Sequence, residues 1–303
     1  MQGTVDDFSY GAVTPVAAYI MACLGAALGL RCVVRSVYNA QSWKPGWLAL
    51  GAASIGCGIW TMHFIAMIGF RVKESRIHYD VGLTVLSLVV AISVVGIGVF
   101  AVGYRGVSTA TLCAAGSVTG LGVAAMHYLG MAAIRMNGYI QYDISVVALS
   151  IVIAIVAATA ALWAAVSIRG FLTSLGASLV MGVAVSGMHY TGMAAVGVHL
   201  HGTKGGGELT GESPLSILLP MLIGPVIFLL LAGVVVMFDP MLVLGEVERN
   251  QPVAVAPAPV ARSRGRLRQA DRPDAPLPHP DDTPGSLFEP PVRPAAARRV
   301  QEW

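Results

Sequence analysis

Met62-His63-Phe64-Ile65-Ala66-Met67 is the stretch that decides how this chain folds, because the chain carries two further copies of it. These copies are Met126-His127-Tyr128-Leu129-Gly130-Met131 and Met188-His189-Tyr190-Thr191-Gly192-Met193. All three follow the pattern Met-His-aromatic-x-small-Met, near the C-terminal end of a long apolar run. The histidines are 64 and 62 residues apart, so the chain consists of three repeats of similar length.

A glycine stands seven residues before each histidine, at Gly56, Gly120 and Gly182, and a methionine stands four residues after each. On an α-helix the positions i−7, i and i+4 lie on nearly the same face. Each copy therefore predicts a helix that carries a small residue, an imidazole and a thioether along one stripe. Together the repeats predict three related pairs of helices, with the motif on the second helix of each pair.

These motifs resemble the MHYT family of bacterial integral membrane sensor domains, which is named after the sequence Met-His-Tyr-Thr. The third copy matches this name at every position, and the resemblance covers roughly Val13 to Met237. It implies paired transmembrane helices with the motifs near the outer membrane face, and a copper centre that senses oxygen, carbon monoxide or nitric oxide. Relatives in this family often carry cytoplasmic domains that make or degrade cyclic di-GMP.

The composition is that of an integral membrane protein. Of 303 residues, 55% are hydrophobic and only 12% are charged, which excludes an ordinary soluble domain. Seven apolar runs reach the roughly 20 residues that are needed to cross the hydrocarbon of a bilayer. The predicted spans are Val13–Leu30, Trp47–Phe70, Val81–Gly103, Thr109–Ile134, Ile144–Ile168, Leu172–Val198 and Leu215–Met237. Asp80, Asp143 and Ser213 are predicted to cap the third, fifth and seventh helices.

Because each repeat is two helices long, its copies keep one orientation and are related by an axis along the membrane normal. The predicted fold is therefore an all-α, polytopic bundle of seven transmembrane helices. It contains three parallel two-helix repeats in a pseudo-threefold arrangement, with the motif helices at the axis, plus one extra helix.

The chain is expected to consist of an outer segment (residues 1–12), a transmembrane sensor domain (13–237) and a cytoplasmic tail (238–303). From about Gln251 the tail is rich in Pro, Ala and Arg, which predicts disorder over most of its length. Arginines follow the last helix, whereas the N-terminal segment is acidic. This charge distribution favours an N-terminus outside and a C-terminus in the cytoplasm, in a bacterial plasma membrane.

The interiors of the predicted spans contain almost no ionisable residue apart from His63, His127 and His189. Such a residue is costly within a membrane, and its default interpretation is functional. Imidazole and thioether together suit copper, particularly Cu(I), because soft sulfur selects a soft ion. We therefore predict a metal site formed by the three histidines and by some of six methionines, namely Met67, Met131, Met193, Met62, Met126 and Met188.

Other interpretations of these residues stay open. Three imidazoles also suit zinc with water in a fourth position, and two histidines are the axial ligands of many haems. The thioethers favour copper over zinc. A histidine can also be structural, with a hydrogen bond to another helix, and a methionine can simply fill a gap in an apolar core. For Met62, Met126 and Met188 this packing role competes evenly with ligation.

The chain is expected to be a sensor and not an enzyme. It has no phosphate-binding glycine loop, no hydrolase nucleophile elbow and no zinc-protease helix. Its expected partners are the lipid bilayer, a diatomic gas and a separate cytoplasmic signalling protein, with no nucleic acid. A metal transporter and an assembly protein with structural histidines are the alternatives. A transporter would need polar or thioether groups on the inner side of each histidine, where the sequence has glycine.

Overall fold

The chain, shown here as a computed structural model, is described over residues 2–38, 43–106, 108–168, 170–200 and 214–239. Within these ranges seven helices are long and apolar enough to cross a membrane. They are α1 (Val13–Tyr38), α2 (Lys44–Ile68), α3 (Val81–Arg105), α4 (Thr109–Ala132), α5 (Ile144–Ser167), α6 (Phe171–Ala194) and α7 (Pro214–Met237). Apolar side chains cover their outward faces, as expected where a helix meets lipid. The seven-helix prediction is confirmed, and the chain is a multi-pass membrane protein.

Two predicted spans end four or more residues away from the ends of the observed helices, whereas the others agree within three residues. The first span was predicted to end at Leu30, but α1 continues for about two more turns, to Tyr38. The sixth was predicted to reach Val198, but α6 ends at Ala194 and the next residues form strand β6 (Val196–Leu200). This second prediction is wrong because a short apolar run has the same hydropathy in a strand as in a helix.

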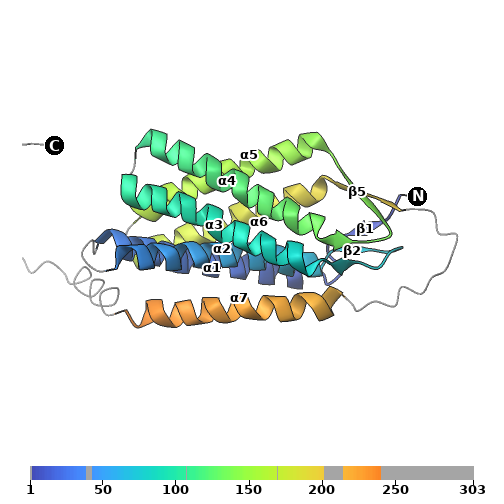
Figure 1. Cartoon of the computed structure of the whole chain (residues 1–303), viewed down its shortest axis with the longest axis horizontal. Coiled ribbons are helices and arrows are strands. Elements are labelled where there is room, and N and C mark those ends of the chain that lie inside the picture. Colours follow the sequence, from blue (N-terminus) through green and yellow to red (C-terminus); the bar gives the residue numbers. More distant parts are fainter. Residues whose placement is uncertain (1, 39–42, 107, 169, 201–213, 240–303) are drawn as a thin grey trace, which may run out of the picture. The chain divides into compact units, whose positions relative to one another are not determined.

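Three short antiparallel strand pairs lie at one end of the helices (Figure 1). In each pair, the segment before the first helix of a repeat is bonded to the segment after its second helix. The pairs are β1 (Val5–Asp6) with β2 (Arg71–Val72), β3 (His78–Tyr79) with β4 (Ile134–Arg135), and β5 (Gly138–Tyr142) with β6. The pairs were not predicted, yet they follow the same threefold pattern as the helices.

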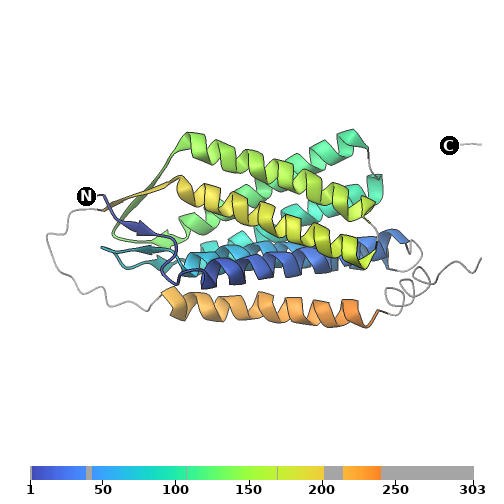
Figure 2. The same cartoon turned by 180° about the vertical axis from the view of Figure 1, so that it is seen from behind.

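The first six helices form a closed ring. Helices that follow one another along the chain pack together, and α6 packs back against α1 (Figure 2). The glycine seven residues before each histidine lies against the first helix of the next repeat, where a Cβ would collide with a neighbour. These contacts are Gly56 with Ile92 of α3, Gly120 with Ile155 of α5, and Gly182 with Cys23 of α1. The predicted pseudo-threefold arrangement is confirmed.

Helix α7 lies outside this ring and packs on α2 and α1 (Figure 1). Its Leu229 and Ala232 belong to one apolar cluster with Leu28 of α1 and Cys57 of α2. Just beyond its C-terminal end, the carboxylate of Asp239 accepts a hydrogen bond from Nε of Arg35 on α1, at 2.9 Å. The seventh helix thus packs mainly on the first repeat, with a smaller contact to strand β3 of the second.

Two of the three predicted helix caps are confirmed. The carboxylate of Asp80 accepts a hydrogen bond from the backbone N–H of Leu83 at 3.0 Å, and that of Asp143 accepts one from Ser145 at 2.8 Å. Ser213 lies outside the described residues. The tail beyond Asp239 also lies outside them, so its cytoplasmic location, its disorder and the domain boundary at residue 238 stay predictions.

Candidate metal centre

The three motif histidines meet at the centre of the ring. Nδ1 of His63 lies 3.1 Å from Nδ1 of His189 and 3.2 Å from Nδ1 of His127, and the third side of this triangle measures 3.3 Å. All three side chains are at least 98% buried. The expectation that three imidazoles converge from separate spans is confirmed. We call this arrangement, made of His63, His127 and His189, the histidine triangle.

The histidine triangle has the dimensions of a metal site. Its centre lies about 1.8 Å from each Nδ1 atom, which is close to the roughly 2.0–2.1 Å that is typical of a metal–imidazole bond. Among the histidine, cysteine and acidic side chains of the described residues, these three histidines are the one group of three or more that could hold a metal ion. The donor set therefore fits a single small ion.

The possible positions of the imidazole protons give a second reason to place a cation here. A neutral imidazole carries one N–H and one lone pair, so three Nδ1 atoms at hydrogen-bond distance cannot all find partners among themselves. If the protons lie on Nε2, three lone pairs converge. In that case Nε2 of His63 and of His127 are buried donors without a hydrogen-bond partner in the described chain. A cation at the centre removes the repulsion between the three lone pairs.

Two glycines of the motif hold these imidazoles in place from the Nε2 side. A Cβ added to Gly130 of α4 would collide with Nε2 of His63, and one added to Gly192 of α6 would stand 2.5 Å from Nε2 of His127. The Nε2 edge of each ring therefore lies close to the backbone of the next motif helix. The small residue in the pattern Met-His-aromatic-x-small-Met is explained by this contact in the second and third copies, whereas the first copy has Ala66.

All six motif methionines lie in the protein interior. Met67, Met131 and Met193 are 1%, 0% and 3% exposed, and Met62, Met126 and Met188 are equally buried. Met62 belongs to an apolar cluster with residues of α1, and Met188 lines a cavity inside the ring. For these two side chains the structure provides a packing role. Ligation by any of the six stays a prediction.

Aromatic rings surround the histidine triangle. The aromatic residue that follows each histidine packs edge-on against its imidazole, with centroid distances of 4.7 Å for Phe64, 4.8 Å for Tyr128 and 4.9 Å for Tyr190. The hydroxyl of Tyr128 is hydrogen-bonded to Oγ of Ser150 on α5, at 2.7 Å. The contact with the imidazole of His127 is thus made by the ring of Tyr128 and not by its hydroxyl.

A related hydrogen bond in the first repeat was missed from the sequence. Nε1 of Trp60 donates to Oγ of Ser87 on α3, at 2.9 Å. Ser87 and Ser150 stand seven residues after Asp80 and Asp143, the two capping residues, so they occupy the same place in successive repeats. A comparison of the repeats at this spacing would have found the two serines, although not their partners.

Comparison with known proteins is consistent with this architecture. A family model described as the bacterial signalling protein N-terminal repeat, MHYT, matches residues 56–115 and 120–178. The chain contains repeats of the MHYT family. The two matched MHYT segments begin at Gly56 and Gly120, which precede the first two motifs. The third motif, with His189, lies beyond the matched segments and joins the same histidine triangle.

The relatives of this MHYT chain are bacterial signalling proteins. It is 36% identical over 192 residues to the bifunctional diguanylate cyclase/cyclic di-GMP phosphodiesterase MucR of Pseudomonas aeruginosa, which covers 62% of this chain and 28% of MucR. It is 37% identical over 185 residues to the cyclic di-GMP phosphodiesterase NbdA of the same organism, covering 59% of this chain and 23% of NbdA. The signaling protein YkoW of Bacillus subtilis is 27% identical over 187 residues, with 59% and 23% covered.

The chain thus spans about a quarter of the length of these relatives. No solved structure matches it significantly. The shared MHYT region is the transmembrane part of the chain, so the likeness concerns the membrane domain and not the activities that the names of the relatives describe.

Proposed function

We propose that this MHYT domain is a membrane sensor that holds one metal ion, copper, through Nδ1 of His63, His127 and His189. The observation that carries this proposal is the triangle of buried Nδ1 atoms with sides of 3.1–3.3 Å. Three convergent lone pairs inside an apolar membrane protein are unfavourable without a cation. The site would lie near the outer face, with the N-terminus outside and the C-terminus in the cytoplasm.

The proposal favours a single ion over a haem. Two histidines that ligate a haem would need the macrocycle between them, whereas these Nδ1 atoms are no more than 3.3 Å apart. Zinc accepts three imidazoles as readily as copper does. The buried thioethers of Met67, Met131 and Met193, one turn beyond the histidines, favour copper. Met62, Met126 and Met188 are the candidates for outer ligands.

Copper bound here would supply a redox-active Lewis acid that can take a diatomic gas as a ligand. The chain contributes the rest. The histidines bind, the adjoining aromatic rings fix their orientation, and the buried methionines keep water out. Because α2 carries His63 and packs on α7, a shift of α2 would reach α7 and the C-terminal part of the chain. We propose that oxygen, carbon monoxide, nitric oxide or a redox change is sensed in this way.

The signal would pass to a cytoplasmic signalling protein. MucR and NbdA, which are named as cyclic di-GMP enzymes, share similarity with this membrane region, and this supports the proposal. By this proposal the described membrane domain senses and does not catalyse, and its partners are lipid, the gas and a protein, with no nucleic acid.

A metal transporter is the alternative that uses the same ligands. It would need a path of donor groups through the inner half of the ring. The side chains one turn inward from the histidines are Ile59, Val123 and Val185, none of which can bind a metal ion. This apolar layer favours a resident ion over a transported one.

The test is elemental analysis and an optical spectrum of protein purified from cells supplied with copper. We expect about one copper ion per chain, lost in the variant with His63→Ala, His127→Ala and His189→Ala. His78→Ala is the matched control, because His78 lies in strand β3, outside the histidine triangle. A chain without stoichiometric metal, or metal retained in the triple variant, would refute the proposal. Metal flux into vesicles would instead support the transporter.

A further inference from the structure

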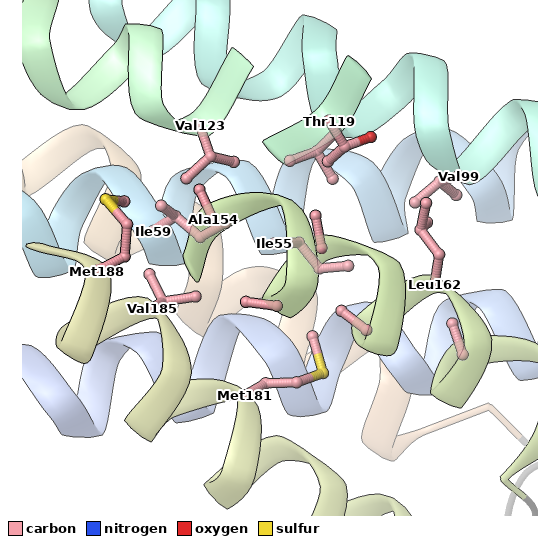
Figure 3. A pocket seen from close by; sticks show the side chains of 15 residues that line it. Ile55, Ile59, Val99, Thr119, Val123, Ala154, Leu162, Met181, Val185 and Met188 are labelled. Carbon is pink, nitrogen blue, oxygen red and sulfur yellow. The ribbon is translucent and has the colours of Figure 1, made fainter. Parts of the chain in front are cut away.

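A cavity of about 60 Å³ lies inside the ring of helices, on the inner side of the histidine triangle (Figure 3). The layer of its wall nearer the histidines consists of Ile59, Val123 and Val185, each of which stands four residues before a motif histidine. Ile55, Thr119 and Met181, four residues further from the histidines, form its inner layer. Apart from Met188, which directly precedes His189, the lining of the cavity therefore begins about one helical turn, roughly 6 Å along the helix, from the three imidazoles.

On balance, α5 contributes smaller side chains to the wall of the cavity than its counterpart α3 carries at the same places. The capping residues Asp80 and Asp143 align the two helices, so Val95 and Val102 of α3 correspond to Ala158 and Ala165 of α5. Both alanines line the cavity. Each lacks two methyl groups that the valine at the same place in the preceding repeat would bring. The missing volume is thus a property of the third repeat in the sequence.

The cavity is suited to an apolar guest and not to water. Thr119 contributes the one hydroxyl among the lining side chains of the described chain, and that hydroxyl donates to the carbonyl of Val94 at 3.3 Å. The volume exceeds what one water molecule needs, but a buried water also needs two to four polar partners. Apolar cavities of this kind stay dry and take up xenon or small apolar molecules.

One side of the cavity is closer to the membrane than the others. Ile59, Val95 and Val123 are buried, whereas Ala161 of α5 and Met181 of α6 are only half-buried. The outward faces of both α5 and α6 are covered by exposed apolar side chains. A small apolar molecule dissolved in the bilayer would therefore reach the cavity between α5 and α6 without crossing a polar barrier.

We propose that this cavity is a binding site for a small uncharged gas molecule, filled from the bilayer between α5 and α6. It holds the gas about one turn from the histidine triangle. This inference deepens the proposed function and rests on it for the purpose of the site. The binding itself depends only on the shape and the apolar lining of the cavity.

Xenon is the probe that tests this site, because it binds without any metal. Full-length, metal-free protein with labelled Ile and Val methyl groups is placed in lipid nanodiscs and titrated with xenon under pressure. We expect saturable chemical-shift changes at the methyl groups of Ile59 and Val123, and only linear, lipid-like changes at the exposed Val152. Equal, non-saturable changes at all three residues would overturn the proposal.

Filling the cavity gives the matched comparison. Ala158→Phe, or Ala158→Leu if the larger side chain prevents folding, should abolish the saturable change, because Ala158 lines the cavity. Ala148→Phe on the same helix is the control and should keep it, since Ala148 is exposed. Saturable changes that survive in the Ala158 variants would place xenon elsewhere and refute the site.

The two proposals can fail separately. Since the titration uses metal-free protein, a chain that never binds copper can still bind xenon at Ile59 and Val123. A chain that binds copper through the histidine triangle but shows no saturable xenon site would retain the metal centre and lose the gas cavity.

Discussion

Gly192→Ala should release metal from the histidine triangle, whereas Gly187→Ala on the same helix should not. A Cβ at position 192 would stand 2.5 Å from Nε2 of His127, while a Cβ at position 187 has nothing within 4 Å. Non-bonded heavy atoms prefer a separation of about 3.5–4.0 Å. The ring of His127 must therefore retreat by about 1 Å, and it carries Nδ1 with it.

A displacement of this size would break the bond between His127 and a metal ion, because metal–ligand distances vary by only about ±0.2 Å around their typical values. His127 would cease to be a ligand and two imidazoles would be left. We expect copper affinity to fall by at least about 10-fold, because the loss of a group that supports a ligand typically lowers metal affinity by roughly 10- to 100-fold. The clash should cost about 1–3 kcal/mol of stability, offset by up to about 1 kcal/mol because alanine favours a helix more than glycine does.

The assay is competition with a chelator of known copper affinity, on protein in detergent, together with thermal unfolding of the metal-free chain. Gly130→Ala repeats the test at another corner of the triangle, because its Cβ would collide with Nε2 of His63. If Gly192→Ala and Gly187→Ala bind copper equally well, the backbone contact does not hold His127 in place. The inference that the triangle depends on close helix approach would then be wrong.

Two further predictions concern the ends of the helices. Arg35→Ala removes the arginine from a buried ion pair with Asp239 and should lower the free energy of unfolding by about 3 kcal/mol, measured by thermal unfolding; Arg35→Lys should recover part of it. The backbone N–H of Leu83, and then Arg135, hold the pKa of the Asp80 carboxyl below its usual value. That stabilisation is present above the usual pKa of about 3.9 and is lost as the pH falls through the lowered one, so the melting temperature should drop in acid and drop less in Asp80→Asn.

The sequence was sufficient to predict the helices and their order because two independent signals agreed. Long apolar runs located the seven spans, and the spacing of His63, His127 and His189 required three repeats with one orientation. The strand β6 was missed because Val196 and Val198 continue the apolar run of α6. Backbone hydrogen bonds to β5 decide its conformation, and those partners are some 60 residues away.

The site was predictable only in part. Its three imidazoles were found because ionisable side chains are rare in these spans, but the choice of Nδ1 over Nε2 follows from ring rotations that no sequence pattern records. Gly130 and Gly192 could not be singled out, since the first copy has Ala66 at this position. The cavity was invisible for a similar reason, because valine and alanine are equally apolar, and periodicity shows which face is buried but not whether it is filled.

The motif helices share a sequence pattern but not an environment. In the most apolar stretch of 18 residues of each helix, 78% of the residues are buried in α2, against 39% in α4 and 22% in α6. The extra helix α7 accounts for part of this difference, because it packs on α2 and has no counterpart beside α4 or α6 in the described chain. His63 is therefore held on a helix that is clamped from both sides, while His189 is carried by a helix that borders lipid and the cavity. A change in the distances within the histidine triangle is resisted least at α6, the same side from which an apolar gas would arrive.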